Sequence, residues 1–155
     1  NNIPRIKKGI ESVCSKYMRQ SEVLKGTDIY MIPYFEDIEK NGGRESLSGL
    51  GLGYRDEYIW GICSYQSQSP EFIEELLKLD YEASMKYLMG FKGIGKKVAN
   101  CICLFGLHHL DAFPVDVWMK KVIDEEYGGV MPAWMTDPYA GVYQQYTFFY
   151  KREKK

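Results

Sequence analysis

The stretch GFKGIGKKVANCICLFGLHHLDAFPVD, residues 90–116, decides how the rest of the chain is interpreted. It begins with a glycine turn, Gly93-Ile94-Gly95, and a run with helical spacing starts at Lys96. That run ends before two adjacent histidines, and Pro114-Val115-Asp116 indicates that another helix begins. A helical run also precedes the turn, so we expect two helices joined by a tight hairpin at about residues 81–106.

The glycine turn suits an anion. Gly93 and Gly95 lack Cβ, so the turn can adopt positive φ and bring its backbone close to a partner. The free N–H groups at the helix start, near Lys96, add the positive end of the helix dipole, and phosphate is the obvious anion. The alternative is a plain turn between two helices, because Gly-x-Gly alone is a weak motif.

Lys97 is the candidate nucleophile. It shares one helix face with Cys101 and Leu104, while Lys96 and Asn100 lie on another side. Three apolar residues on the adjacent face are expected in the core: Val98, Ile102 and Phe105. Partial removal of Lys97 from water would lower its pKa and leave an amine able to attack carbon near neutral pH. The alternative is a lysine whose stem only covers apolar surface.

Asp116 follows Pro114 and precedes a helical run at 117–126, which makes it a good N-cap. A carboxylate beside a nucleophilic amine could also stabilise positive charge that develops on a sugar. The two roles do not exclude one another.

The length of 155 residues suits one domain, which we expect at residues 1–150, followed by a frayed charged tail at 151–155. Further helices are expected at 33–39, 44–48, 55–65, 70–77, 81–89, 117–126 and 139–150. The first helix, within 1–19, has Asn2 as cap and an apolar stripe formed by Ile3, Ile6, Ile10, Val13, Cys14 and Tyr17. No run is long enough to span a membrane, and no signal peptide is visible.

The net charge of −1 gives no global attraction to nucleic acid, so any contact must come from a local patch. The candidates are Arg5, Lys7, Lys8, Arg55, Lys92, Lys96, Lys97, Lys120 and Lys121. The spacing of Cys14, Cys63, Cys101 and Cys103 fits neither a zinc ribbon nor a disulfide framework. We expect buried free thiols, no iron–sulfur cluster and a reducing compartment: cytoplasm or nucleoid in a prokaryote, nucleus in a eukaryote, not secretion.

The central stretch resembles the helix-hairpin-helix DNA glycosylases, and within them the 8-oxoguanine DNA glycosylase/AP lyase family. The shared pattern is Gly93 and Gly95, then Lys97 two residues on, then Pro114-Val115-Asp116 about twenty residues later. The resemblance implies an all-α helix-hairpin-helix glycosylase domain. It also implies that Lys97 attacks C1′ of the damaged nucleotide, forms a Schiff base and leads to β-elimination, while Asp116 assists departure of the base.

Two further segments match the family. Asn1-Asn2-Ile3-Pro4-Arg5-Ile6 implies that Asn1, Asn2 and Arg5 contact the base opposite the lesion. Gly53-Tyr54-Arg55 implies that Tyr54 wedges into the duplex and Arg55 reads the widowed cytosine. The alternatives are a helix cap with surface charge for the first, and a solvated helix start with a packing tyrosine for the second.

The last helix matches through Tyr139-Ala140-Gly141 and the Gln and Phe that follow. By resemblance, Gln144 bonds the Watson–Crick edge of the flipped base, and Phe148 and Cys101 lie on its two faces. For Phe148 the alternative is core packing. No cofactor is expected, but the resemblance implies a cation, monovalent or calcium, at the hairpin carbonyls of Met89, Phe91 and Ile94.

Two departures qualify the resemblance. Trp118 stands where eukaryotic members often carry a histidine, and the sequence starts at the Asn-Asn-Ile segment, which a mixed α/β domain normally precedes. The resemblance therefore leaves two alternatives open, a fragment of a longer protein or a chain that lacks this α/β domain. The function expected is excision of 8-oxoguanine opposite cytosine from double-stranded DNA, with strand nicking, by a monomer that needs no membrane. The alternatives are a glycosylase for another damaged purine, a DNA-binding module without chemistry, and a helical protein–protein module.

Overall fold

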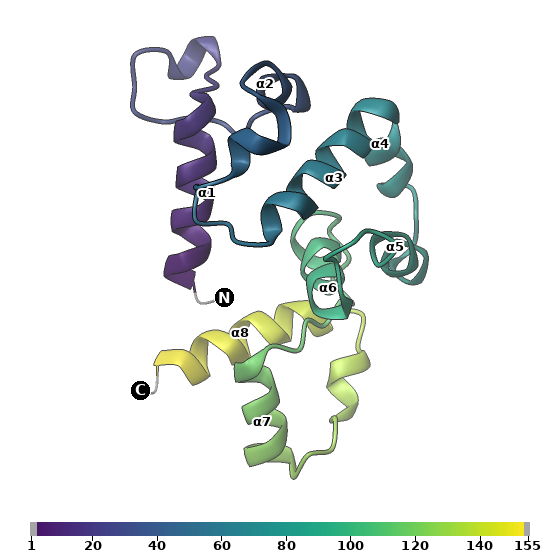
Figure 1. Ribbon diagram of the computed structural model, residues 1–155. Helices are drawn as coiled ribbons and strands as arrows, with labels where there is room; N and C mark the ends of the chain where they lie inside the picture. Colours follow the sequence, from purple (N-terminus) through teal and green to yellow (C-terminus); the bar gives the residue numbers. More distant parts are fainter. Residues whose placement is uncertain (1–2, 154–155) are drawn as a thin grey trace. The chain divides into compact units, whose positions relative to one another are not determined.

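The computed structural model describes residues 3–153, and within them every regular element is helical. The α-helices are α1 (Ile3–Tyr17), α2 (Phe35–Lys40), α3 (Arg55–Gln68), α4 (Phe72–Leu76), α5 (Tyr81–Leu88), α6 (Lys96–Phe105), α7 (Val117–Tyr127) and α8 (Ala140–Glu153) (Figure 1). Three 3-10 turns join them: η1 (Glu22–Leu24), η2 (Gly43–Leu47) and η3 (Ala133–Thr136). The predicted all-α class is confirmed.

The chain divides into two compact units, Asn1–Phe72 and Ile73–Lys155, where the sequence suggested one domain. In the first unit, α2, η2 and α3 pack together. Ile38 and Leu47 are each only 1% exposed, and the rings of Phe35 and Trp60 lie 5.0 Å apart. None of the described helices is long and apolar enough to cross a membrane.

The apolar stripe of α1 is only partly buried. Val13 and Cys14 are in the core, which confirms the burial expected for the Cys14 thiol. Ile3, Ile6 and Ile10 are 40 to 51% exposed, although they share the stripe that the sequence predicted. The stripe has the right helical spacing, but among the described residues too little apolar surface covers its first turns.

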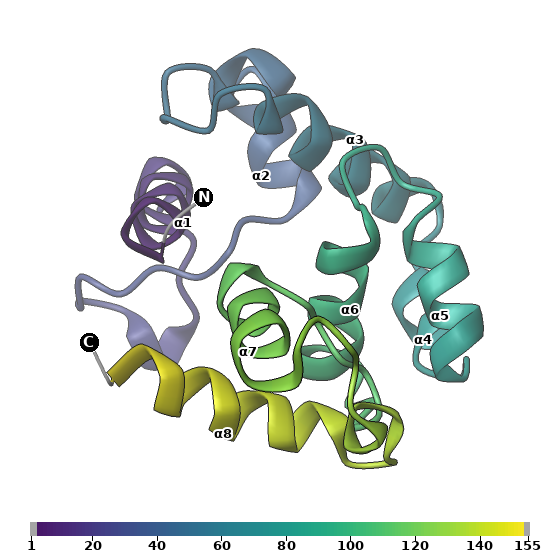
Figure 2. The same cartoon turned by 90° about the horizontal axis from the view of Figure 1, so that it is seen from below.

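The second unit is built from two helix pairs. α5 packs against α6, and α7 packs against α8, which also contacts η3 (Figure 2). The carboxylate of Asp80 starts α5 by accepting the Ala83 N–H at 2.8 Å. A core cluster joins α7, η3 and α8 through Phe113, Met119, Val122, Ile123, Met135 and Ala140, with Trp134 and Phe148 packed against it.

Gly141 lets the first turn of α8 approach the segment that follows α6. Its N–H donates to the Leu110 carbonyl at 2.7 Å. A Cβ at this position would lie 2.7 Å from the Ala112 carbonyl oxygen and would also collide with Leu104. The glycine is therefore required by a close approach of two backbones, which holds α8 beside α6.

The structure corrects the predicted faces of the hairpin helices. Val98 and Phe105 are exposed, whereas Ala99 and Cys103 are fully buried. Asn100, predicted on an open side, is 3% exposed, because it accepts the Tyr81 hydroxyl at 2.7 Å. In α5 the buried residues are Ser84, Met85 and Leu88.

The end of the chain also differs from its prediction. The helix continues through Lys151 and Arg152 to Glu153, whereas a frayed tail was predicted from residue 151. Lys151 explains the extension, because its ammonium bonds Glu126 at 2.8 Å and Glu125 at 2.9 Å on α7. These bonds raise the pKa of Lys151 to about 12.

Candidate glycosylase site

The hairpin between α5 and α6 has one glycine at positive φ and one with an ordinary extended backbone. Gly93 has a φ of 92°, as the sequence predicted. Gly95 has a φ of −89° and a ψ of 176°, an extended backbone that any residue can adopt, so the predicted positive φ is wrong there. Apart from its chain neighbours and its own helix backbone, a Cβ on Gly95 would meet no atom of residues 3–153 within 4 Å. The backbone at Gly95 is thus left open to an outside partner.

α6 begins immediately after Gly95, which is its N-cap. The Gly95 carbonyl accepts the Ala99 N–H at 2.9 Å, so the helix is formed from its first turn. The N–H groups of that first turn have no partner four residues earlier in the helix. Lys96 lies at this end and is exposed, so the positive end of the helix dipole and an exposed ammonium group lie at the same end of α6.

Lys97 also lies on the first turn of α6, and its side chain is exposed. Its predicted partial removal from water is therefore wrong in this structure. Any activation of the amine by desolvation would have to come from a bound partner that covers the first turn.

Asp116 is the N-cap of α7, as predicted. Its Oδ1 accepts the N–H groups of Trp118 at 3.0 Å and Met119 at 2.9 Å. Both bonds hold one carboxylate oxygen in place, while the side chain stays partly exposed. The cap therefore fixes the carboxylate at the surface, where it could also stabilise positive charge on a bound sugar.

The pKa of the Cys101 thiol responds to the charges of both Lys97 and Asp116. Burial raises the pKa of the Cys101 thiol, the charge of Lys97 lowers it, and the charge of Asp116 raises it. Both charges must lie near the sulfur to affect its titration. The charges of an amine on α6 and of a carboxylate at the start of α7 therefore both influence this thiol.

Gln144 and Phe148 lie one turn apart on α8. Gln144 is 3% exposed, and its Nε2 donates to the Pro114 carbonyl at 3.1 Å, two residues before Asp116. Phe148 is partly buried against the α7–η3–α8 core, so one part of its side chain packs in the core, as the alternative for this residue proposed. The Pro114 bond brings the α8 glutamine next to the segment that carries the carboxylate.

The hairpin carbonyls remain a candidate cation site. Phe91 O accepts the Ile94 N–H at 3.1 Å, and a carbonyl oxygen keeps a second lone pair for an ion. With Met89 and Ile94 it offers oxygen ligands of the kind that hard cations take, and an ion there would help to orient a phosphate. Elsewhere, residues 3–153 contain no cluster of three or more His, Cys, Asp or Glu side chains that could hold a metal.

The other predicted DNA contacts lie in the first unit. Tyr54 is 64% exposed at the start of α3, and the Arg55 guanidinium lies 4.5 Å from its ring centre and donates to its hydroxyl at 3.0 Å. Arg5 is exposed on α1. Asn1 and Asn2 lie outside the described residues.

All four cysteines are free. Cys14 and Cys103 are buried, as predicted, whereas Cys63 and Cys101 are partly exposed. Burial and the charge of Asp111 raise the pKa of the Cys103 thiol to about 11, which leaves it unreactive at neutral pH.

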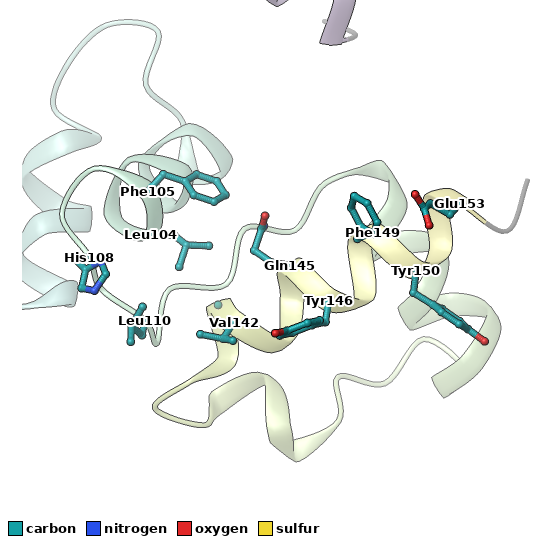
Figure 3. Close-up of a pocket in the computed structure, with 11 residues that line it drawn as sticks. Leu104, Phe105, His108, Leu110, Val142, Gln145, Tyr146, Phe149, Tyr150 and Glu153 are labelled. Atoms are coloured by element: carbon teal, nitrogen blue, oxygen red, sulfur yellow. The ribbon is translucent and has the colours of Figure 1, made fainter.

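Sequence reasoning missed two features near the site. Gln145 donates a hydrogen bond from Nε2 to the Oε1 of Gln144. A cavity of about 780 Å³ lies between α6 and α8, where Phe105, Tyr146 and Phe149 are among its walls (Figure 3). The two adjacent glutamines at 144–145 were the available signal for this hydrogen bond. Side chains at neighbouring positions on a helix normally point apart, so the sequence did not predict the contact.

Curated proteins resemble this chain in sequence. No family model matches the chain. An N-glycosylase/DNA lyase of Saccharomyces cerevisiae is 29% identical over 137 residues, 82% of this chain and 36% of that protein. N-glycosylase/DNA lyase OGG1 of Arabidopsis thaliana is 32% identical over 124 residues, 76% of this chain and 33% of that protein.

Solved structures match over nearly the whole chain. MBOgg1 in complex with a low-affinity DNA ligand superimposes with a TM-score of 0.84 at 30% identity, covering 99% of this chain and 56% of that one. The Clostridium acetobutylicum 8-oxoguanine glycosylase/lyase, bound to duplex DNA with cytosine opposite 8-oxoguanine, gives a TM-score of 0.83 at 29% identity with the same coverage. The chain spans about half of these structures and about a third of the curated relatives above.

The all-helical fold matches the helical domain of 8-oxoguanine DNA glycosylases. Its relatives narrow the assignment. The chain is related to the N-glycosylase/DNA lyases, and the solved structures that it resembles are 8-oxoguanine glycosylases.

Proposed function

We propose that this domain acts in base excision repair. It removes 8-oxoguanine opposite cytosine from duplex DNA and then nicks the strand through Lys97. One observation carries the proposal: Lys97 lies one helical turn before Cys101 on α6, and the charges of Lys97 and Asp116 both influence the pKa of the Cys101 thiol. The names of the relatives support the same chemistry.

The reaction starts with base loss. Neutral Lys97 Nζ attacks C1′ of the flipped nucleotide, the C1′–N9 bond breaks, and the base leaves with its electron pair and takes up a proton. The carboxylate of Asp116 lowers the energy of the positive charge that develops on the sugar. Because the α7 cap already holds this carboxylate, little reorganisation is needed when the charge appears.

Strand cleavage follows from the covalent intermediate. The attached amine loses a proton, the C1′–O4′ bond opens, and a protonated Schiff base joins Lys97 to C1′. Loss of a C2′ proton then expels the 3′ phosphate by cleavage of the C3′–O bond. Hydrolysis of the imine returns the free lysine. No external oxidant or reductant is consumed.

The DNA would be held by backbone contacts near the same amine. The open backbone at Gly95 and the first-turn N–H groups of α6 suit a phosphate, and Lys96 adds charge at this end of the helix. Duplex bound over the exposed Lys97 would also exclude water from the amine, which favours the neutral form needed for attack.

The decisive experiment is borohydride trapping of this chain on two sets of duplexes. One set carries 8-oxoguanine opposite each of the four bases, and the other carries an abasic site. A covalent complex on 8-oxoguanine, strongest opposite cytosine, is the expected result. A complex on the abasic duplex alone would leave the lyase chemistry in place but overturn lesion excision by this chain.

Absence of a complex on every duplex would overturn both activities. Duplex binding should then be measured by fluorescence anisotropy. Affinity that falls steeply with added salt would identify a DNA-binding module, because phosphate contacts release counterions. Affinity that is absent at low salt would leave only the protein–protein alternative.

A further inference from the structure

Gln144, the side chain proposed to read the base, is held at both ends of its amide. Nε2 donates to the Pro114 carbonyl at 3.1 Å, and Oε1 accepts from Nε2 of Gln145. Gln144 is only 3% exposed, so water does not compete freely for these bonds. The amide keeps one N–H and one lone pair for a ligand.

The direction of this amide is chemically defined. The Pro114 carbonyl can only accept, so it favours the orientation in which Gln144 turns its NH2 toward residue 114. In that orientation the Gln144 oxygen faces Gln145, which supplies a donor. Turning the Gln144 amide over would place two carbonyl oxygens against each other beside Pro114, which would leave both buried acceptors without a donor.

The direction matters because purine edges differ in the order of their polar groups. A guanine-type edge presents an acceptor, O6, next to a donor, N1–H. An adenine-type edge presents a donor, the N6 amino group, next to an acceptor, N1. An amide with a fixed order of N–H and oxygen complements one of these edges and opposes the other.

We propose that Gln145 is a specificity-determining position that, with the Pro114 carbonyl, fixes the donor–acceptor order of Gln144 and selects guanine-type over adenine-type oxidised purines. The proposal rests on the proposed function of this site. Gln145 is a positioning residue, since it acts through Gln144 and needs no contact with the base.

Gln145 is well placed to act this way without being part of the core. The Gln145 side chain is exposed. It lines the same cavity as Leu104 and Phe105 of α6 (Figure 3). A substitution at this position removes no buried apolar group, so the variants are expected to fold. The hydrogen bond to Gln144 can therefore be changed alone.

The test compares three variants of this chain. Gln145→Glu has nearly the same shape but can only accept, so it favours a turned-over Gln144. Gln145→Lys can only donate, so it should keep the native order. Tyr146→Glu is the matched control, because it adds the same negative charge one residue away on a side chain that is 76% exposed.

The readout is the ratio of kcat/KM for 8-oxoguanine over 8-oxoadenine, each opposite cytosine in the same duplex. Any general effect of charge on DNA binding cancels in this ratio. Gln145→Glu should lower the ratio by about tenfold, the size expected when one buried hydrogen bond is replaced by an acceptor pair. Gln145→Lys and Tyr146→Glu should leave it within about twofold. A ratio for Gln145→Glu equal to that of the unmodified chain overturns the proposal.

A second measurement needs no activity. Hydrogen exchange of the Gln144 side-chain NH2, followed by NMR without DNA, should be much slower than in an exposed glutamine and faster in Gln145→Glu. Exchange at the free rate in the unmodified chain overturns the inference whatever the chain excises. If the unmodified chain excises neither lesion, the proposed function fails instead, and the selection of a base by this site fails with it.

Discussion

Two glycine turns lead into helices, and they use glycine for different reasons. At the start of α3, Gly51 and Gly53 have φ angles of 76° and 62°, which L side chains rarely adopt. At the start of α6, Gly95 has an ordinary extended backbone and open space around its missing Cβ. The chain's own backbone therefore explains Gly53 but does not explain Gly95. The reason for Gly95 is best sought in a partner that approaches the α6 turn.

The residues after each turn sharpen the contrast. The α6 turn is followed by Lys97, whose charge reaches the Cys101 thiol near Asp116. The α3 turn is followed by Arg55, whose guanidinium is held over the Tyr54 ring. One turn thus carries groups suited to covalent chemistry, and the other carries a planar donor suited to reading a base.

The largest effect is expected from Lys97→Met. Without the amine no Schiff base can form, so borohydride trapping should fall by at least about a thousandfold, as for loss of a covalent nucleophile. Lys96→Met is the matched control, because it removes the same charge from the same turn and should only weaken duplex binding. Trapping that survives in Lys97→Met would assign the nucleophile to another amine.

Glycine-to-alanine substitutions test the two turns directly. Gly53→Ala should lower the free energy of unfolding by about 1–2 kcal/mol, because alanine is strained at positive φ. Gly95→Ala should change it by less than about 0.5 kcal/mol, yet weaken duplex binding by roughly tenfold, or about 1.4 kcal/mol, by holding the phosphate away. Chemical denaturation and anisotropy measure the two quantities. Equal duplex affinity in Gly95→Ala would remove the argument for close approach at the hairpin.

Arg55→Met separates recognition from chemistry. Loss of a bidentate donor to a base should lower the preference for cytosine opposite the lesion by about tenfold. Trapping on an abasic duplex should continue. Excision opposite each of the four bases gives the preference. An unchanged preference would assign Arg55 to its contact with Tyr54 alone, as the packing alternative for this helix start requires.

The sequence predicted the helices of the second unit well, because their start and stop signals are local. Asp80, Asp116 and Gly128 cap α5 and α7 where the pattern placed the boundaries. The residue pairs around Cys101 were also predictable, since i, i+4 spacing on one helix puts Lys97 near it.

The errors concern burial, which depends on distant residues. Phe105 is apolar but lies beside the cavity between α6 and α8, whereas polar Asn100 is buried because Tyr81, nineteen residues away, offers a hydroxyl. The end of α8 depends on Lys151 reaching α7, a contact with no local signal. The link from Gln145 through Gln144 to Pro114 joins positions thirty residues apart and could be found only in three dimensions.

The smallest expected effect compares a thiol in each of the two helices. Burial raises the pKa of Cys63 on α3, whereas at Cys101 on α6 the charge of Lys97 opposes the effect of burial. Lys97→Met removes this opposition, so the pKa of Cys101 should rise, less thiolate should be present at pH 8, and alkylation by iodoacetamide should slow by a few fold. Cys63 is the internal reference within the same sample.

Mass spectrometry of both cysteines between pH 7 and 10 measures the ratio of the two rates, which cancels any general change in reagent or folding. The ratio of the Cys101 alkylation rate to the Cys63 rate should fall in Lys97→Met. It should stay constant in Lys96→Met, because among the charges of the described residues those that influence the pKa of Cys101 are Lys97 and Asp116. A ratio that does not respond to Lys97→Met would separate the amine from the thiol in solution. It would then remove the observation on which the proposed site rests, even if duplex DNA still bound the α6 turn.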